Sequence, residues 1–130
     1  MTEPTNSMRT PLAKARGLGS AKSGVHHWWH QRLTAIAMVP LVLSALYLVL
    51  RIAGSDYEQA ILLLQNPFNA AILLLLIITG FWHAMLGVQV VIEDYVGSDW
   101  GRITSIMMVK AVLILLATLS ALSLFKIVSI

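Results

Sequence analysis

The sequence predicts an all-α membrane protein with three transmembrane helices, and three observations support this fold class. Hydrophobic residues make up 58% of the 130 residues and charged residues 12%, whereas soluble domains carry about 25% charged residues. Three apolar stretches, at about 33–52, 68–92 and 103–127, are long enough to cross a hydrocarbon core as helices. None of them has the period-two alternation of a barrel strand, so helices must satisfy the backbone in lipid.

The segment before the first span predicts the orientation of the chain. Residues 1–24 contain several glycines and prolines and no apolar period, so we expect a flexible tail followed by a membrane anchor domain at 25–130. Five of the nine basic residues precede the first span, which places the N-terminus in the cytoplasm by the positive-inside rule. These residues are Arg9, Lys14, Arg16, Lys22 and Arg32. The basic charge therefore indicates orientation rather than nucleic-acid binding.

The connecting segments follow from three spans. Val25–Gln31 contains three histidines and two tryptophans, a composition suited to the lipid headgroups at the inner face. The loop Ala53–Pro67 then lies outside, and Asn66 followed by Pro67 has the residue types of an N-cap and a first helical position, which predicts the start of the second span. The loop Glu93–Arg102 returns to the inner side, and the C-terminus ends outside.

His83 is the strongest functional lead, because it lies in a stretch from Ala60 to Ile92 that has no charged residue. Ionisable groups at membrane depth usually line a site or bind something. On a helix, Gly80, His83 and Gly87 share one stripe. A neutral imidazole can ligate haem iron, and glycines one turn away leave room for a flat macrocycle. The glycines can instead serve close helix packing, and the imidazole can simply bond a neighbouring helix.

The inner end of the second span carries a phenol beside carboxylates. Asp94 lies eleven residues after His83, about 16 Å along the helix and near the same stripe. With Tyr95 it could hold the head group of an amphipathic redox carrier, since a phenol can donate to a quinone carbonyl. The alternative is an ordinary interfacial tyrosine next to solvated acids. We expect His83 and this cluster to face neighbouring polypeptides and a cavity.

These residues resemble a known family. The segment His83–Val96 (HAMLGVQVVIEDYV), together with Gly24-Val25-His26 and Arg32-Leu33-Thr34-Ala35, is similar to the hydrophobic membrane anchor subunit of succinate dehydrogenase, the D-type cytochrome b subunit of respiratory complex II. The specific part is a histidine followed at an eleven-residue spacing by Asp-Tyr in a three-span chain of this size. The resemblance extends from Gly24 to the end of the third span.

The resemblance implies a haem b shared with a partner subunit, and ubiquinone as substrate. It implies that His83 is an axial ligand of the haem iron, and that Asp94 and Tyr95 belong to the ubiquinone pocket. It also implies that His26 and Arg32 lie near the haem propionates, a role that suits the fork of a guanidinium. The alternatives are a positive-inside anchor for Arg32 and an ordinary interfacial role for His26.

The chain is not expected to be an enzyme alone, because it has no cysteine and no nucleotide-binding fingerprint. The resemblance implies a C-type membrane anchor subunit that supplies the second haem ligand and packs with this chain in a helical bundle, an iron-sulfur subunit and a flavoprotein subunit. It also favours the inner (cytoplasmic) membrane of a bacterium over the mitochondrial inner membrane. The rival hypothesis is a cofactor-free structural anchor or assembly subunit. A proton-coupled transporter has little support, since there are no repeats or broken helices.

Overall fold

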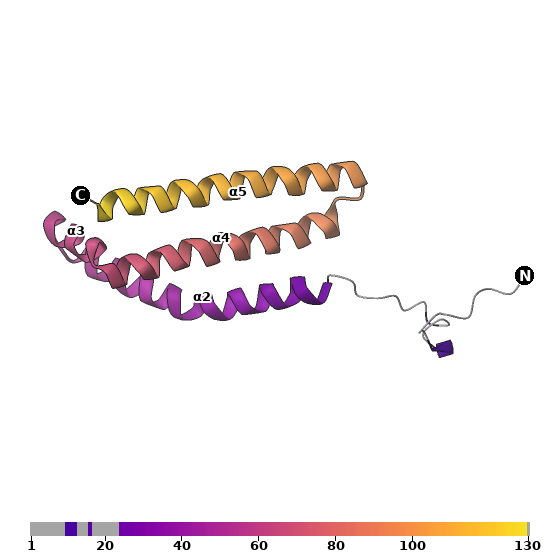
Figure 1. The fold of residues 1–130 in the computed structure, drawn as a ribbon, viewed down its shortest axis with the longest axis horizontal. Coiled ribbons are helices and arrows are strands. Elements are labelled where there is room, and N and C mark those ends of the chain that lie inside the picture. The colour runs from indigo at the N-terminus through magenta and orange to yellow at the C-terminus, as the bar shows by residue number, and fades with distance from the viewer. Residues whose placement is uncertain (1–9, 13–15, 17–23, 130) are drawn as a thin grey trace, which may run out of the picture.

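The computed structural model describes residues 10–12, 16 and 24–129. Its helices, labelled as in Figure 1, are α2 (Gly24–Ala53), α3 (Tyr57–Gln65), α4 (Pro67–Tyr95) and α5 (Asp99–Val128). Three of them, α2, α4 and α5, are long and apolar enough to cross a membrane. The all-α membrane fold with three spans is confirmed. Most of the predicted N-terminal tail lies outside the described residues.

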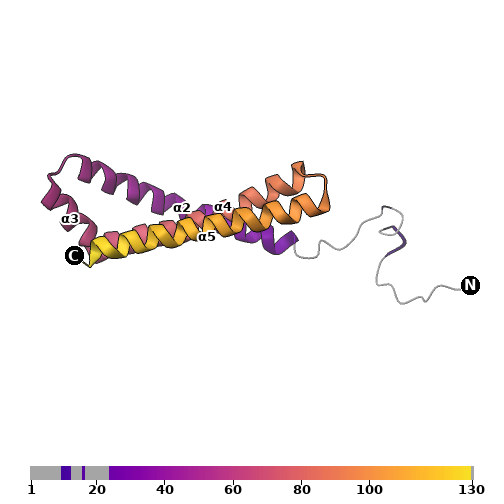
Figure 2. The same ribbon diagram turned by 90° about the horizontal axis from the view of Figure 1, so that it is seen from above.

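The three long helices form a single layer rather than a closed bundle. The central helix α4 contacts both α2 and α5, which do not contact each other within the described part of the chain. The start of α2, the end of α4 and the start of α5 lie at the same end of the molecule (Figure 1), and α2 runs obliquely to the other two (Figure 2). Among the described residues, only Ala45 and Leu48 are buried. The remaining apolar surface must therefore be covered by lipid or by other helices.

Local capping explains where the spans begin and end. Asn66 Oδ1 accepts hydrogen bonds from the backbone N–H groups of Phe68 (3.0 Å) and Asn69 (3.4 Å), and Pro67 occupies the first turn. This predicted start of the second span is confirmed. The predicted inner loop is shorter than expected, because α4 continues to Tyr95 and α5 starts at Asp99. At the other boundary, α2 begins at Gly24, so the predicted interfacial segment is continuous with the first span.

The predicted outer loop between the first two spans is wrong, because it contains the helix α3. The Asp56 carboxylate caps this helix by accepting from the Gln59 N–H at 2.9 Å, and the apolar run that follows favours burial of one face. The helix contacts α2, α4 and α5 and lies across one end of the layer (Figures 1 and 2). The connection between the first two spans therefore packs against all three long helices.

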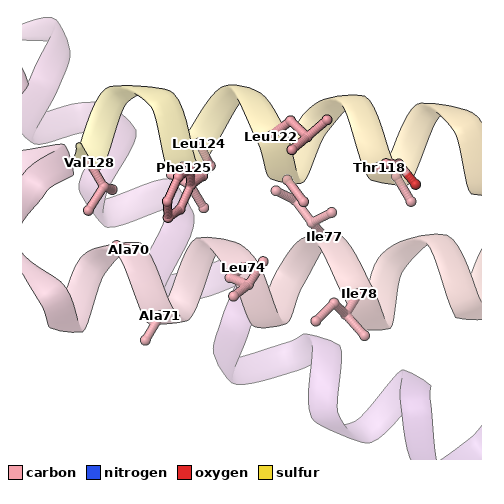
Figure 3. A pocket seen from close by; sticks show the side chains of 12 residues that line it. Ala70, Ala71, Leu74, Ile77, Ile78, Thr118, Leu122, Leu124, Phe125 and Val128 are labelled. Atoms are coloured by element: carbon pink, nitrogen blue, oxygen red, sulfur yellow. The ribbon is translucent and has the colours of Figure 1, made fainter. Parts of the chain in front are cut away.

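An apolar groove of about 650 Å³ lies between α4 and α5, in the half of the molecule near α3. Figure 3 shows that side chains of both helices line it, including Leu74 and Ile77 from α4 and Leu122 and Phe125 from α5. The one hydroxyl among its lining residues, that of Thr118, donates to the Ile114 carbonyl at 2.8 Å. The groove therefore presents hydrocarbon, which suits a lipid chain or a helix rather than polar chemistry.

Candidate functional site

The His83 imidazole lies between α4 and α2. Its Nδ1 atom is 2.9 Å from the Thr34 hydroxyl oxygen, and its Nε2 atom is 3.3 Å from Nε2 of Gln31. Both of these partners belong to α2 of the same chain. The position of His83 is half-buried.

The hydrogen bonds of Thr34 assign the protons of the imidazole. A threonine hydroxyl has one hydrogen, and this one is directed to backbone carbonyls, that of His30 at 2.7 Å and that of Gln31 at 3.1 Å. The oxygen therefore accepts from His83, which puts the proton on Nδ1. The Gln31 amide nitrogen can only donate, so the contact with Nε2 requires a lone pair there. Both contacts indicate the same tautomer, with the proton on Nδ1 and a lone pair on Nε2 that meets the Gln31 amide.

Three polar side chains of α2 share the face that meets α4. His27, Gln31 and Thr34 are spaced by four and three residues, which places them on one side of a helix. Two atoms of this face, Nε2 of His27 and Oε1 of Gln31, are buried without a hydrogen-bond partner in the described residues. Such atoms cost free energy unless something else satisfies them. The sequence analysis did not predict Gln31 and Thr34 as partners of His83. Their spacing from each other and from His27, which places all three on one helix face, was the signal that could have found them.

The two glycines near His83 have different surroundings. A Cβ atom added to Gly87 would lie 3.5 Å from Nε2 of Gln31, so this glycine lets the polar face of α2 approach α4. Gly80 has no described atom within 4 Å of its ideal Cβ position. It borders a second apolar groove of about 360 Å³, with Ala84 and Leu113 among the lining residues. Within this chain, close helix packing therefore explains Gly87 but not Gly80.

At the C-terminal end of α4, Asp94 and Tyr95 are exposed, and Tyr95 retains 85% of its accessible surface. No described hydrogen bond or ion pair joins either residue to another side chain, and neither lines the two apolar grooves described above. Both side chains are therefore without a described polar partner within this chain.

Arg32 and His26 lie in the first turns of α2, at the same end of the molecule as Tyr95 (Figure 1). The Arg32 guanidinium lies 5.3 Å from the centre of the Trp28 ring and forms no ion pair among the described residues. His26 is exposed. The structure therefore places four predicted site residues at one end of the molecule, and no described hydrogen bond or ion pair joins them. They are His26, Arg32, Asp94 and Tyr95.

The described residues contain no group of three or more His, Cys, Asp or Glu side chains that could hold a metal ion. His83 therefore does not belong to a described cluster of such side chains.

Comparison with known proteins identifies the family. Residues 6–123 match the family of the succinate dehydrogenase/fumarate reductase transmembrane subunit. The chain belongs to this family. It is a membrane anchor subunit of the succinate dehydrogenase type, and the resemblance seen in its sequence is confirmed.

Several relatives of the family are similar over most of this chain. The succinate dehydrogenase hydrophobic membrane anchor subunit of Rickettsia bellii is 47% identical over 106 residues, which cover 82% of this chain and 85% of the relative. The subunit of the same name from Paracoccus denitrificans is 36% identical over 86 residues, 66% and 67% of the two chains. The succinate dehydrogenase membrane anchor subunit of Reclinomonas americana is 32% identical, covering 72% of this chain and 80% of its own length. No solved structure matches the chain.

The close approach of α2 at Gly87 predicts a size limit at this position. Gly87→Ala should be tolerated, because its methyl group meets Gln31 at ordinary contact distance. Gly87→Leu should force the helices apart and cost about 1–3 kcal/mol, as overpacking does. Thermal denaturation of the detergent-solubilised assembly measures both. Equal stability of the alanine and leucine variants would show that the two helices are not in close contact there.

Proposed function

We propose that this chain acts in succinate dehydrogenase by supplying His83 as one axial ligand of a b-type haem and Tyr95 and Asp94 to a ubiquinone-reduction site. The observation that carries the haem proposal is the Thr34–His83 contact. It holds the proton on Nδ1 and leaves the Nε2 lone pair for iron. A hydrogen-bonded second nitrogen is what ligating histidines commonly have.

The residues around His83 fit such a ligand. Gln31 is the only described partner of Nε2, at a long 3.3 Å, and iron would replace its amide there because one lone pair binds either one hydrogen-bond donor or one metal ion. Nε2 of His27 and Oε1 of Gln31 are buried without a described hydrogen-bond partner, which also supports the binding of another polar group at this face of α2. When bound, a b-type haem accepts and returns single electrons. A second axial ligand would come from the partner anchor, since this chain offers one imidazole at that depth.

Arg32 and His26 are proposed to meet the haem propionates. Arg32 has no carboxylate partner among the described residues, and its guanidinium rests on Trp28, which leaves N–H groups for an anion. His26 is one helical turn before Trp29 on the same exposed stretch of α2.

For the quinone, the phenol of Tyr95 would donate a hydrogen bond to a carbonyl oxygen, and the Asp94 carboxylate would hold or pass a proton. Reduction of ubiquinone to the quinol takes two electrons, delivered by the iron-sulfur subunit, and two protons. The exposure of both side chains supports a site between subunits, because neither is occupied by contacts within this chain.

The proposed assembly has this chain, a C-type anchor, an iron-sulfur subunit and a flavoprotein subunit in the inner membrane of a bacterium. The basic residues before α2 support a cytoplasmic N-terminus, so Tyr95 would face the iron-sulfur subunit. The rival, a cofactor-free anchor, would use Gly87 for packing alone and carry no haem absorbance.

His83→Ala, co-expressed with the partner subunits, should lower the haem content of the purified assembly at least about tenfold, because an axial ligand is lost. The b-type absorption spectrum per flavin measures this. His30→Ala is the control, since that side chain is exposed on α2 and makes no described contact with His83. An unchanged spectrum in the His83 variant would leave the cofactor-free anchor as the better explanation.

Thr34→Val should weaken haem retention about 10–100-fold and shift the haem midpoint potential, because Nδ1–H loses its acceptor. Thr34→Ser keeps the hydroxyl and should behave like the parent chain. Haem titration of the apo-assembly and a redox titration give the two readouts. A valine variant that matches the serine variant in both would mean that Thr34 does not position the ligand.

Tyr95→Phe should lower the rate of succinate-dependent ubiquinone reduction about five- to tenfold, the loss expected for one hydrogen bond, while reduction of a soluble artificial acceptor stays unchanged. Tyr57→Phe is the matched control, because Tyr57 is also exposed (80%) but lies in α3 at the other end of the molecule. If the two phenylalanine variants reduce ubiquinone at the same rate, Tyr95 does not orient the quinone.

A further inference from the structure

A polar hollow of about 370 Å³ lies at the α3 end of the molecule, away from His83 and Tyr95. The end of α2, the helix α3 and the junction before α4 form it (Figures 1 and 2). Its lining residues are Arg51, Gly54, Ser55, Gln59, Leu62, Leu63 and Asn66. Because the spans end here, a membrane that they cross would have its lipid headgroups beside the hollow.

The hollow carries a positive charge that is not neutralised within the described chain. Arg51 donates to the Tyr47 hydroxyl at 3.0 Å and lies 5.9 Å from that ring, but it forms no described ion pair. A guanidinium has five N–H donors, so most remain free. No carboxylate lines the hollow, and the nearby Asp56 already accepts from the Gln59 N–H as the cap of α3.

The other polar groups add donors. The Asn66 carbonyl oxygen is used by the N–H groups of Phe68 and Asn69, so its amide NH₂ group has no described acceptor. The side-chain amide of Gln59 has no described hydrogen bond. Leu62 and Leu63 supply an apolar wall beside these donors. Donors around one guanidinium, together with hydrocarbon, fit an anion that carries acyl chains.

We propose that this hollow binds the phosphate of an anionic phospholipid, with Arg51 as its principal ligand and Gln59 as a second donor. Arginine matches phosphate with two parallel hydrogen bonds. The site does not depend on the proposed haem or quinone roles, because none of its residues takes part in them. Inorganic phosphate has the same anionic oxygens but lacks the chains that Leu62 and Leu63 would contact.

The test uses the complete assembly, purified in detergent, delipidated and titrated with phosphatidylglycerol, with bound lipid counted by native mass spectrometry. Arg51→Gln should lose one tightly bound phosphatidylglycerol, with affinity at least about tenfold weaker. Lys126→Gln is the matched control, since Lys126 is an exposed cation in the last turn of α5 at the same end but outside the hollow. It should keep the full count.

Gln59→Ala provides a second readout should Arg51→Gln fail to assemble, because its amide makes no described contact within the chain; it should weaken the same lipid several-fold. Retention of the lipid in both hollow variants, or equal loss in Arg51→Gln and Lys126→Gln, overturns the proposal in favour of diffuse surface charge. Millimolar inorganic phosphate should not displace the lipid. Full displacement would assign the hollow to free phosphate instead.

Discussion

The structure depends on one polar contact inside an apolar interface, the one between His83 and Thr34. An imidazole at this depth has no water to satisfy its two nitrogens, so the facing helix must supply partners. Thr34 accepts from Nδ1 while its own hydrogen is held by a backbone carbonyl. This requirement fixes which face of α2 meets α4. Gly87 is small for the same reason, because Gln31 packs against it.

The rest of the fold is incomplete without other molecules. A single layer of three helices exposes two apolar faces, and it buries only two described side chains. In lipid, apolar contact between helices gives little driving force, so packing with partner helices and polar contacts decides association. Polar groups also lack partners within the described chain, since one buried atom each of His27 and Gln31 has no hydrogen bond. The described chain is therefore one part of a larger membrane assembly, in agreement with its family.

Sequence reasoning found the features that depend on local chemistry. The three spans follow from the length of apolar runs, and Asn66-Pro67 marks a helix start because both residues act within one turn. It missed α3, because the apolar run after the Asp56 cap is too short to be predicted as a span. It also missed the partners of His83. Apolar patterns show that a helix is in lipid but not which neighbour it meets, and Thr34 is 49 residues away from His83.

The division of each proposed site between chains has a physical consequence. For these sites the chain offers one imidazole, that of His83, and one phenol, that of Tyr95, and neither lines the grooves or the hollow described above. A ligand that binds only where two chains meet stabilises their association by mass action, since it binds the assembled state and not the separate subunits. Haem and quinone sites at subunit boundaries would thus couple assembly to function. The 650 Å³ groove between α4 and α5 has no free polar group among its lining residues, so it contributes hydrocarbon contact and cannot replace either site.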